Sequence, residues 1–504
     1  GSSATGCRAA TLGGQSNGAS GAWATAGGGI SNVASGESSV VSGGDSNTAS
    51  GIRAAIGGGL ANTATQCVST VAGGDYNDAT ANRAFIGGGY NNTASSSYTT
   101  VSGGYQNTAS ATRATIGGGQ FNFATGSQSF VGGGLCNCAT TTNSHIGGGF
   151  RNCVVGSMEA STISGGYGNT ICGSGCEATI GGGRGNRTVG WWTFVGGGVG
   201  NVASAESSIS GGALNTASGY RSAVSGGWCN VTSGCQAGVL SGCGNTASGY
   251  RAVAVGGASN ISSNSWSTVV GGRNNTASGC MSFIGGGCGN TVSGGYASSL
   301  LGGCGNTAAG TRSTVGGGML NTVTGASGTI AGGEYNCICS AGIFGIIAGG
   351  YCSIVSGCSA SVLGGRANLA SGNCSTVGGG LLNCATATWS FVGGGNNNRA
   401  TCNFAFSGGG NNNTNSAYYG ALVGGKSNTA SGSYAGVIGG LSNTASGSRS
   451  TIGGGQSNST TNTWSAVVGG LANSASGYIS FVGGGDCNCA TNDRSTVAGG
   501  NNNK

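Results

Sequence analysis

The sequence predicts an all-β fold, a parallel β-solenoid in which one continuous array of about 33 coils occupies residues 1–504 without a recognisable cap. Three observations predict it. A similar segment of 15 residues returns along the chain, as in residues 21–35, 36–50 and 51–65. Glycine makes up 116 of 504 residues whereas proline is absent. Each segment also repeats one pattern of apolar and small side chains, which favours strands over helices.

Composition excludes several other classes of protein. Collagen requires abundant proline, and a transmembrane helix requires about 20 consecutive apolar residues, which occur nowhere in this chain. Only 17 Lys and Arg and 10 Asp and Glu are present, so charge-driven disorder is also disfavoured. The sequence therefore predicts a folded repeat protein without membrane insertion.

One numbering describes every coil. The common pattern G-x-x-S-T-V-x-G-G-x-x-N-T-A-S defines coil positions 1 to 15, and position 1 of the first full coil is Gly6. Position 12 is Asn except where Ser353 replaces it, and position 6 is mostly Val or Ile. Members of these two rows are Asn47, Asn62, Asn77 and Asn92, and Val41, Ile56 and Val71. A few coils differ in length by one or two residues, and we expect these changes to lie at corners.

Two short strands are expected in each coil, at positions 3–7 and 12–15. Glycines at positions 8 and 9 allow positive φ in the turn between them, and glycine at position 1 turns the chain again. Coils stacked at about 4.8 Å would give a rod of roughly 160 Å. Asn at position 12 can adopt a left-handed corner conformation and can hydrogen-bond from coil to coil, so we assign this row a structural role.

Self-association is expected from the small core. One coil buries little more than a Val or Ile and an Ala, worth about 2–4 kcal/mol against an ordering cost of about 1.5 kcal/mol per residue. Backbone hydrogen bonds along the stack and apolar contacts with other chains would supply the difference. We therefore expect a homo-oligomer.

Large side chains form a stripe at position 3. The members singled out are Arg53, Arg83, Arg113, Trp266, Trp389 and Trp464. This stripe is either a seam between chains or a basic and aromatic surface for glycans or an anionic surface. The net charge of +7 is spread along the chain and gives a weak field, so we expect no nucleic-acid partner.

The 22 cysteines suggest staples between coils. Cys138 and Cys153 occupy position 13 of consecutive coils, and Cys288 and Cys304 both lie two residues before the Asn row. Each pair is a possible disulfide, with free packed thiols as the alternative. Most other cysteines have no partner one coil away, which leaves bonds between chains or simple packing. No His or third Cys completes a zinc site, so we expect no metal and no cofactor.

Catalytic chemistry is not expected. His145 is the only histidine, and the carboxylates are scattered over different coil positions. A general acid–base site requires such groups at one place, so we predict no catalytic residue and no enzyme activity.

The repeat resembles a known family. The string S-x-V-x-G-G-x-x-N-x-A-x-G, as in residues 313–325, is similar to the head repeat of trimeric autotransporter adhesins. The resemblance covers essentially the whole chain. It implies a left-handed parallel β-roll, three chains packed about one axis, and adhesion to a host surface or glycan.

These observations predict a structural fibre or filament protein, located outside the cell, on the cell surface or on a virion. Both ends stop without a cap, so the chain is either part of a longer protein or stacks end to end into a filament. The alternative function is ice binding, because Thr-x-Ser at positions 13 and 15, as in Thr48 and Ser50, resembles the Thr-x-Thr rows of insect-type antifreeze β-solenoids.

Overall fold

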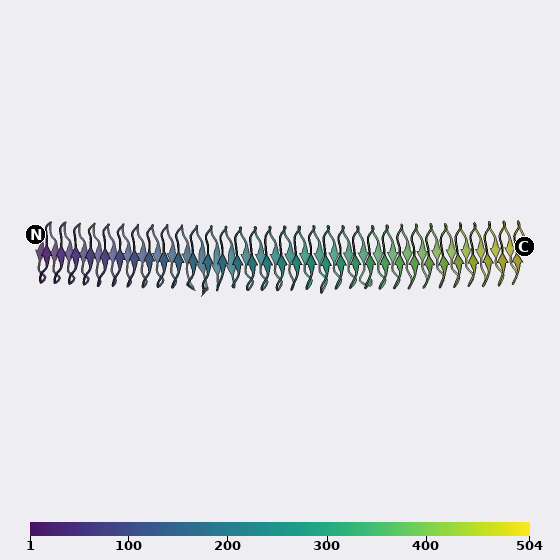
Figure 1. Ribbon diagram of the computed structural model, residues 1–504, viewed down its shortest axis with the longest axis horizontal. Coiled ribbons are helices and arrows are strands. Elements are labelled where there is room, and N and C mark those ends of the chain that lie inside the picture. Colours follow the sequence, from purple (N-terminus) through teal and green to yellow (C-terminus); the bar gives the residue numbers. More distant parts are fainter. The chain divides into compact units, whose positions relative to one another are not determined.

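The computed structural model describes all residues from Gly1 to Lys504 and contains only strands, turns and irregular segments. It comprises two compact units, Gly1–Arg251 and Ala252–Lys504, and each unit is a stack of similar coils (Figure 1). The prediction of an all-β parallel solenoid with about 33 coils is confirmed.

Each coil contributes two very short strands. In the first unit, β8 (Ala55–Ile56) lies at positions 5–6 and β9 (Thr63–Ala64) at positions 13–14 of one coil. In the second unit, β54 (Phe391–Val392) and β55 (Arg399–Ala400) occupy the same positions. The strands predicted at positions 3–7 and 12–15 were therefore too long. Position 3 belongs to a turn instead, since Arg53 has a φ of 55° that no strand accommodates.

Equivalent strands of successive coils pair in parallel and form two sheets in each unit. We call the sheet of positions 13–14 the alanine sheet and that of positions 5–6 the valine sheet, after their inward side chains. In the first unit, the alanine sheet runs from β1 (Ser3–Ala4) to β35 (Thr246–Ala247), and the valine sheet runs from β2 (Ala10–Thr11) to β34 (Gly238–Val239). In the second unit, the alanine sheet runs from β37 (Ile261–Ser262) to β67 (Cys489–Ala490), and the valine sheet runs from β36 (Val253–Ala254) to β68 (Thr496–Val497).

The core lies between the two sheets of each unit. Val71 pairs in register with Ile56 on one side and Ile86 on the other, so the inward side chains form rows. Val41 is fully buried, as is the facing Ala49 of the same coil. Ser or Ala at position 4, as in Ser39, is buried as well, so the core consists of a row of Val or Ile, a row of Ala and a row of small side chains beside them.

The corners are built from left-handed residues at positions 3, 9 and 11. Arg53, Gly44 and Ser46 have φ values of 55°, 94° and 60°. This conformation costs a residue other than glycine about 1–2 kcal/mol, and backbone hydrogen bonds to the preceding coil hold it. Arg53 N–H donates to the Glu37 carbonyl at 2.7 Å, and Ser46 N–H donates to the Ile30 carbonyl at 2.8 Å. The left-handed residue is thus the one before the Asn row, so the prediction of left-handed asparagines was wrong.

Longer coils keep both sheets in register. In two consecutive long coils, β22 (Ser157–Glu159) and β25 (Ser174–Cys176) form a separate two-stranded parallel sheet at a corner. The valine sheet continues past them, because Ile163 pairs with Ile146 and Ile180. Insertions therefore enlarge the corner, where Met158 of β22 is fully buried, and leave the register of both sheets unchanged.

Candidate functional site

The asparagine row is buried, and its amides are fully engaged. Asn92 donates from Nδ2 to the Gly88 carbonyl at 3.0 Å and to the Gly104 carbonyl at 2.9 Å. Its Oδ1 accepts the backbone N–H of Asn107 at 3.0 Å. The same bonds recur at Asn47, Asn62 and Asn77. No polar atom of this row remains for a ligand, so the row ties each coil to the next.

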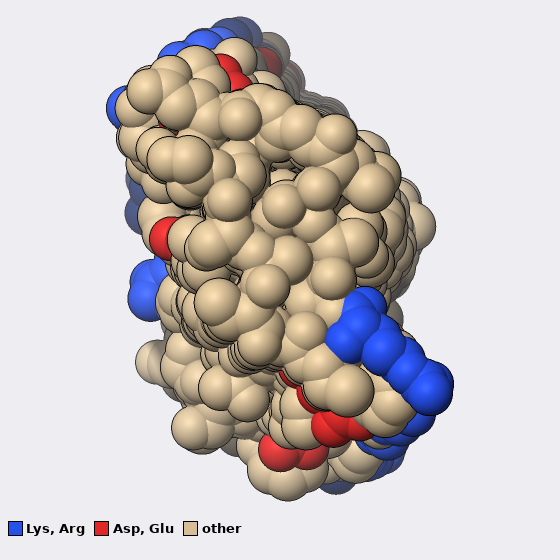
Figure 2. Space-filling model, turned by 90° about the vertical axis from the view of Figure 1, so that its left-hand side faces the viewer, with Lys and Arg blue, Asp and Glu red and all other residues tan.

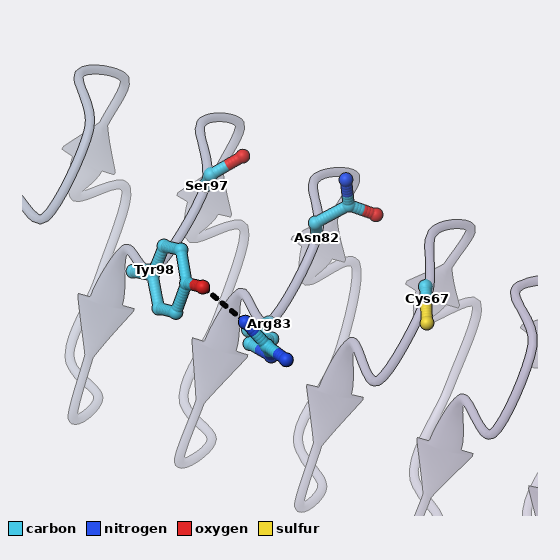
Figure 3. Close-up of a pocket in the computed structure, with 5 residues that line it drawn as sticks. All are labelled: Cys67, Asn82, Arg83, Ser97 and Tyr98. Atoms are coloured by element: carbon cyan, nitrogen blue, oxygen red, sulfur yellow. Dashed lines mark hydrogen bonds between the residues drawn. The ribbon is translucent and has the colours of Figure 1, made fainter.

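The position 3 stripe forms a stack of rings and guanidinium groups in the first unit. The guanidinium carbon of Arg83 lies 5.0 Å from the ring centre of Tyr98, and that of Arg113 lies 5.9 Å from the same ring. Arg83 also donates a hydrogen bond to the Tyr98 hydroxyl (Figure 3). Both arginines therefore hold one tyrosine between them. Sequence reasoning singled out the two arginines and missed Tyr98, although its spacing of 15 residues from both was visible.

A surface pocket of about 270 Å³ adjoins this stack. Cys67, Asn82, Arg83, Ser97 and Tyr98 line it, from positions 2 and 3 of three consecutive coils (Figure 3). All five side chains are exposed or half-buried. With no buried polar group aimed into it, the pocket is a gap between corner side chains and lacks the enclosure typical of a ligand site.

A longer stack occupies position 3 in the second unit. The ring centres of Phe404 and Tyr419 lie 4.5 Å apart and those of Tyr419 and Tyr434 lie 5.4 Å apart, and the rings of each pair are stacked nearly parallel. Arg449 then lies 5.6 Å from Tyr434 and 5.0 Å from Trp464. Each ring face in this row is covered by the next coil, so the row stabilises the corner and leaves mainly ring edges exposed.

The other predicted stripe residues lie at the same corner outside these two stacks. Arg53 and Trp389 are exposed, and 58% of the surface of Trp389 is accessible to solvent. Trp266 is exposed as well. Contacts between coils also occur elsewhere in the stripe, where Arg221 forms an ion pair with Glu206.

All 22 cysteines are free thiols, and none is buried in the core. Cys138 and Cys153 lie directly opposite each other in the alanine sheet, and Cys288 and Cys304 are opposed at position 10. A hydrogen bond with Cys153 lowers the pKa of the Cys138 thiol to about 7, while the same bond and burial raise the pKa of Cys153. Disulfides at both pairs stay predictions.

Rows of hydroxyl groups lie on the outer face of the alanine sheet. The longest uninterrupted threonine row is Thr276, Thr291, Thr307 and Thr322, and each pairs in register with the next. Elsewhere this face carries Asp78, Phe123 and Arg187, so the rows are short.

Groups with catalytic or metal-binding chemistry are dispersed. His145 stacks on Phe130, with ring centres 4.8 Å apart. No group of three or more His, Cys, Asp or Glu side chains is placed to hold a metal ion. No helix is long and apolar enough to cross a membrane.

The outer face of the valine sheet was missed by sequence reasoning. Side chains at positions 5 and 7 point outward there, and many are large and apolar. Leu301, Leu363 and Ile438 at position 7 keep 59%, 56% and 59% of their surface exposed. The alternation of positions 5, 6 and 7 carried this signal, because two residues flanking an inward Val or Ile must face outward.

Comparison with known proteins does not assign the chain to a family. No protein-family model matches the chain, and no curated protein matches it. The physical properties of the coil are therefore the basis for a functional proposal.

Proposed function

We propose that this chain is a structural fibre protein, the shaft or adhesive part of an assembly outside the cell, on the cell surface or on a virion surface. It self-associates, as a trimer like the adhesin heads that its repeat resembles or as a filament. Its task is mechanical, and any adhesion comes from many weak contacts repeated along the coils.

One observation carries this proposal, namely that the buried amide at position 12 bonds both to the glycine turn of its own coil and to the neighbouring coils. The amide of Asn122, for example, bonds to Gly118, Gly134 and Asn137 and leaves nothing for a substrate. Such a ladder resists local opening, because a coil can leave only by breaking bonds to both neighbours. Resistance to unfolding and proteolysis is the property a fibre requires.

Self-association is supported by the surface. Exposed large apolar side chains recur in both units, among them Leu12 at 74% and Phe344 at 59% exposure. Soluble monomers rarely expose apolar patches beyond a few hundred Å². A host-surface or glycan target is best sought at single exposed rings such as Trp389, because the stacked rings offer mainly their edges.

Electron microscopy combined with mass photometry tests this proposal. The 47.5 kDa chain is expected to form dimers, trimers or filaments under reducing conditions. A single-chain mass at micromolar concentration would overturn self-association. Under the fibre proposal, limited proteolysis should leave the coils intact at protease concentrations that digest a globular control.

Ice binding is the second candidate, and the threonine row from Thr276 to Thr322 favours it. Parallel strands at about 4.8 Å present its hydroxyl groups at a regular spacing. This function predicts thermal hysteresis that Thr291→Tyr abolishes. Thr329→Tyr, on the other sheet, is the matched control and should leave the hysteresis intact.

A further inference from the structure

The outer face of the valine sheet carries no charged side chain in any coil. Every residue at positions 5 and 7 is Gly, Ala, Ser, Thr, Val, Leu, Ile, Phe or the single His145. The alanine sheet differs, since Asp78, Arg187 and Arg399 lie on its outer face. Figure 2, which views the chain from the end of its first coils, shows Lys, Arg, Asp and Glu side chains standing out at the rim of that end. Surfaces that stay in water usually carry charges that prevent association, so this face is unusual.

Large apolar side chains stand exposed along this face in the second unit. Their exposed fractions range from 36% for Phe283 to 59% for Leu301 and Ile438. The members are Val270, Phe283, Leu301, Ile346, Leu363, Phe391, Phe406, Val423, Ile438, Val468 and Phe481. At on the order of 80 Å² each, they offer roughly 900 Å² of apolar surface, and a stable interface buries about 800 Å² per partner.

Phenylalanine on this face always has glycine beside it in the same coil. Every phenylalanine at position 5 is followed by glycine at position 7. The pairs are Phe85 and Gly87, Phe130 and Gly132, Phe194 and Gly196, Phe283 and Gly285, Phe391 and Gly393, Phe406 and Gly408, and Phe481 and Gly483. The ring leans over the glycine, so that a Cβ on Gly393 would lie 3.4 Å from a ring carbon of Phe391.

Coils with a large residue at position 7 show the reverse arrangement. Leu301 and Leu363 follow Ser299 and Ser361, and Ile438 follows Gly436. No coil carries an aromatic ring together with a second large side chain on this face. Rings and other bulky side chains therefore never stand side by side in one coil of this face, and such a surface can pack against another sheet at about 10 Å separation.

We propose that the outer face of the valine sheet is the seam at which a second copy of this chain packs. The proposal rests on the self-association put forward above and specifies its surface. Two copies meet with their valine sheets face to face, so that the uncharged faces are buried and the charged corners stay in water.

A second copy fits this face better than another partner because of its period. Large and small side chains at positions 5 and 7 recur at multiples of the coil spacing, which is about 4.8 Å. Only a partner with the same axial repeat keeps its side chains matched to them over many coils. Another copy of this chain supplies that repeat.

Three lysines placed on the face test the proposal. The variant Leu301→Lys, Leu363→Lys, Ile438→Lys alters exposed positions, so folding should survive, but it sets like charges against each other across the seam. The matched control Ala309→Lys, Ser371→Lys, Ser446→Lys places the same charges in the same three coils, on the outer face of the alanine sheet. Analytical ultracentrifugation of the full chain in reductant measures association, and circular dichroism checks folding.

We expect the face variant to dissociate at least about 100-fold more readily than wild type, and the control to associate like wild type. Unchanged association of a folded face variant would overturn the seam while leaving the proposed self-association standing. A monomeric wild type would overturn both. If the lysine variant fails to fold, Leu301→Ser, Leu363→Ser, Ile438→Ser serves instead, because Ser42 and Ser102 already occupy position 7. That variant should associate at least about 10-fold more weakly than wild type. If it associated as strongly as wild type, the proposed seam would be overturned.

Discussion

Among single residues, asparagine at position 12 ties its own turn to the coils on both sides through one buried amide. Its Nδ2 joins two glycine carbonyls, one in its own coil and one in the next, and its Oδ1 accepts a third bond. A buried amide without partners would be costly, so asparagine suits this position only because the glycine turn supplies the carbonyls. Ser353 is the natural exception, since its hydroxyl accepts only a long contact of 3.4 Å from the Asn368 N–H, while its own N–H still donates to Asn336 Oδ1.

Restoring asparagine at this position should stabilise the chain locally. Ser353→Asn would place Nδ2 within reach of the Gly349 and Gly365 carbonyls, as in all other coils. We expect the free energy of local opening to rise by about 1–2 kcal/mol. Hydrogen exchange of the amides in residues 336–368 measures this change. Asn383→Ser is the reverse control and should lower the same quantity, and equal exchange in wild type and both variants would contradict the account.

Cys138 should react as a thiolate at neutral pH. The bond with Cys153 lowers its pKa from 9.0 to about 7, so its reactive form appears at lower pH than that of an ordinary thiol. We expect half-maximal alkylation of Cys138 near pH 7. The thiol of Cys337, whose pKa burial and Cys339 raise to about 11, should stay unreactive there. Mass spectrometry after iodoacetamide treatment in reductant, over a pH series, measures both.

The matched variant for this test is Cys153→Ala. It removes the donor, so the midpoint for Cys138 should move up by about two pH units toward the ordinary value. An unchanged midpoint in the variant would show that the hydrogen bond is not the cause.

At the scale of elements, glycine turns set the geometry that two-residue strands could not set alone. Position 9 has positive φ throughout, 94° in Gly44, and a Cβ there would overlap the carbonyl oxygen of Gly59 in the next coil. Its neighbour Gly43 has open space around it. Two adjacent glycines in the same turn therefore differ in what they tolerate.

This difference is testable with two alanine variants. Gly44→Ala should destabilise its coil by at least about 2 kcal/mol, because left-handed strain adds to the overlap with backbone. Gly43→Ala should be neutral or stabilise by up to about 1 kcal/mol, because it restricts only the unfolded chain. Hydrogen exchange of residues 30–62 compares them, and equal effects would refute the assignment.

At the scale of the whole molecule, stability is a sum of nearly identical coils with nearest-neighbour contacts. Each coil bonds only to the coils before and after it, as Val71 does to Ile56 and Ile86. Both units, Gly1–Arg251 and Ala252–Lys504, follow this rule. No single coil is then essential, provided that the register of its neighbours is kept.

Deleting one whole coil should therefore be tolerated. Removal of residues 36–50 joins Ser35 to Gly51, the same junction as Ser50 to Gly51, and preserves every row. We expect the circular dichroism signal per residue to equal that of wild type. The melting midpoint should stay within about 5 °C of the wild-type value. Removal of residues 36–43 instead leaves a coil with seven residues and misplaces Asn47. If both deletions melted alike, register would not govern stability.

The architecture of the coil was predictable from the amino-acid sequence, since the 15-residue spacing, the Asn row and the Val or Ile row are local and periodic. The contacts on the candidate surfaces were harder to predict from the sequence. Arg83 and Arg113 could be placed on one stripe from their spacing, but their shared contact with Tyr98 depends on how side chains lean between coils.

The strand lengths, the left-handed corners and the charge-free outer face of the valine sheet emerge from contacts between coils. The cause is that a strand of two residues is not stable in isolation. It exists because the coils on both sides supply its hydrogen bonds, and those bonds also hold Arg53 and Ser46 in a conformation that their sequence does not favour.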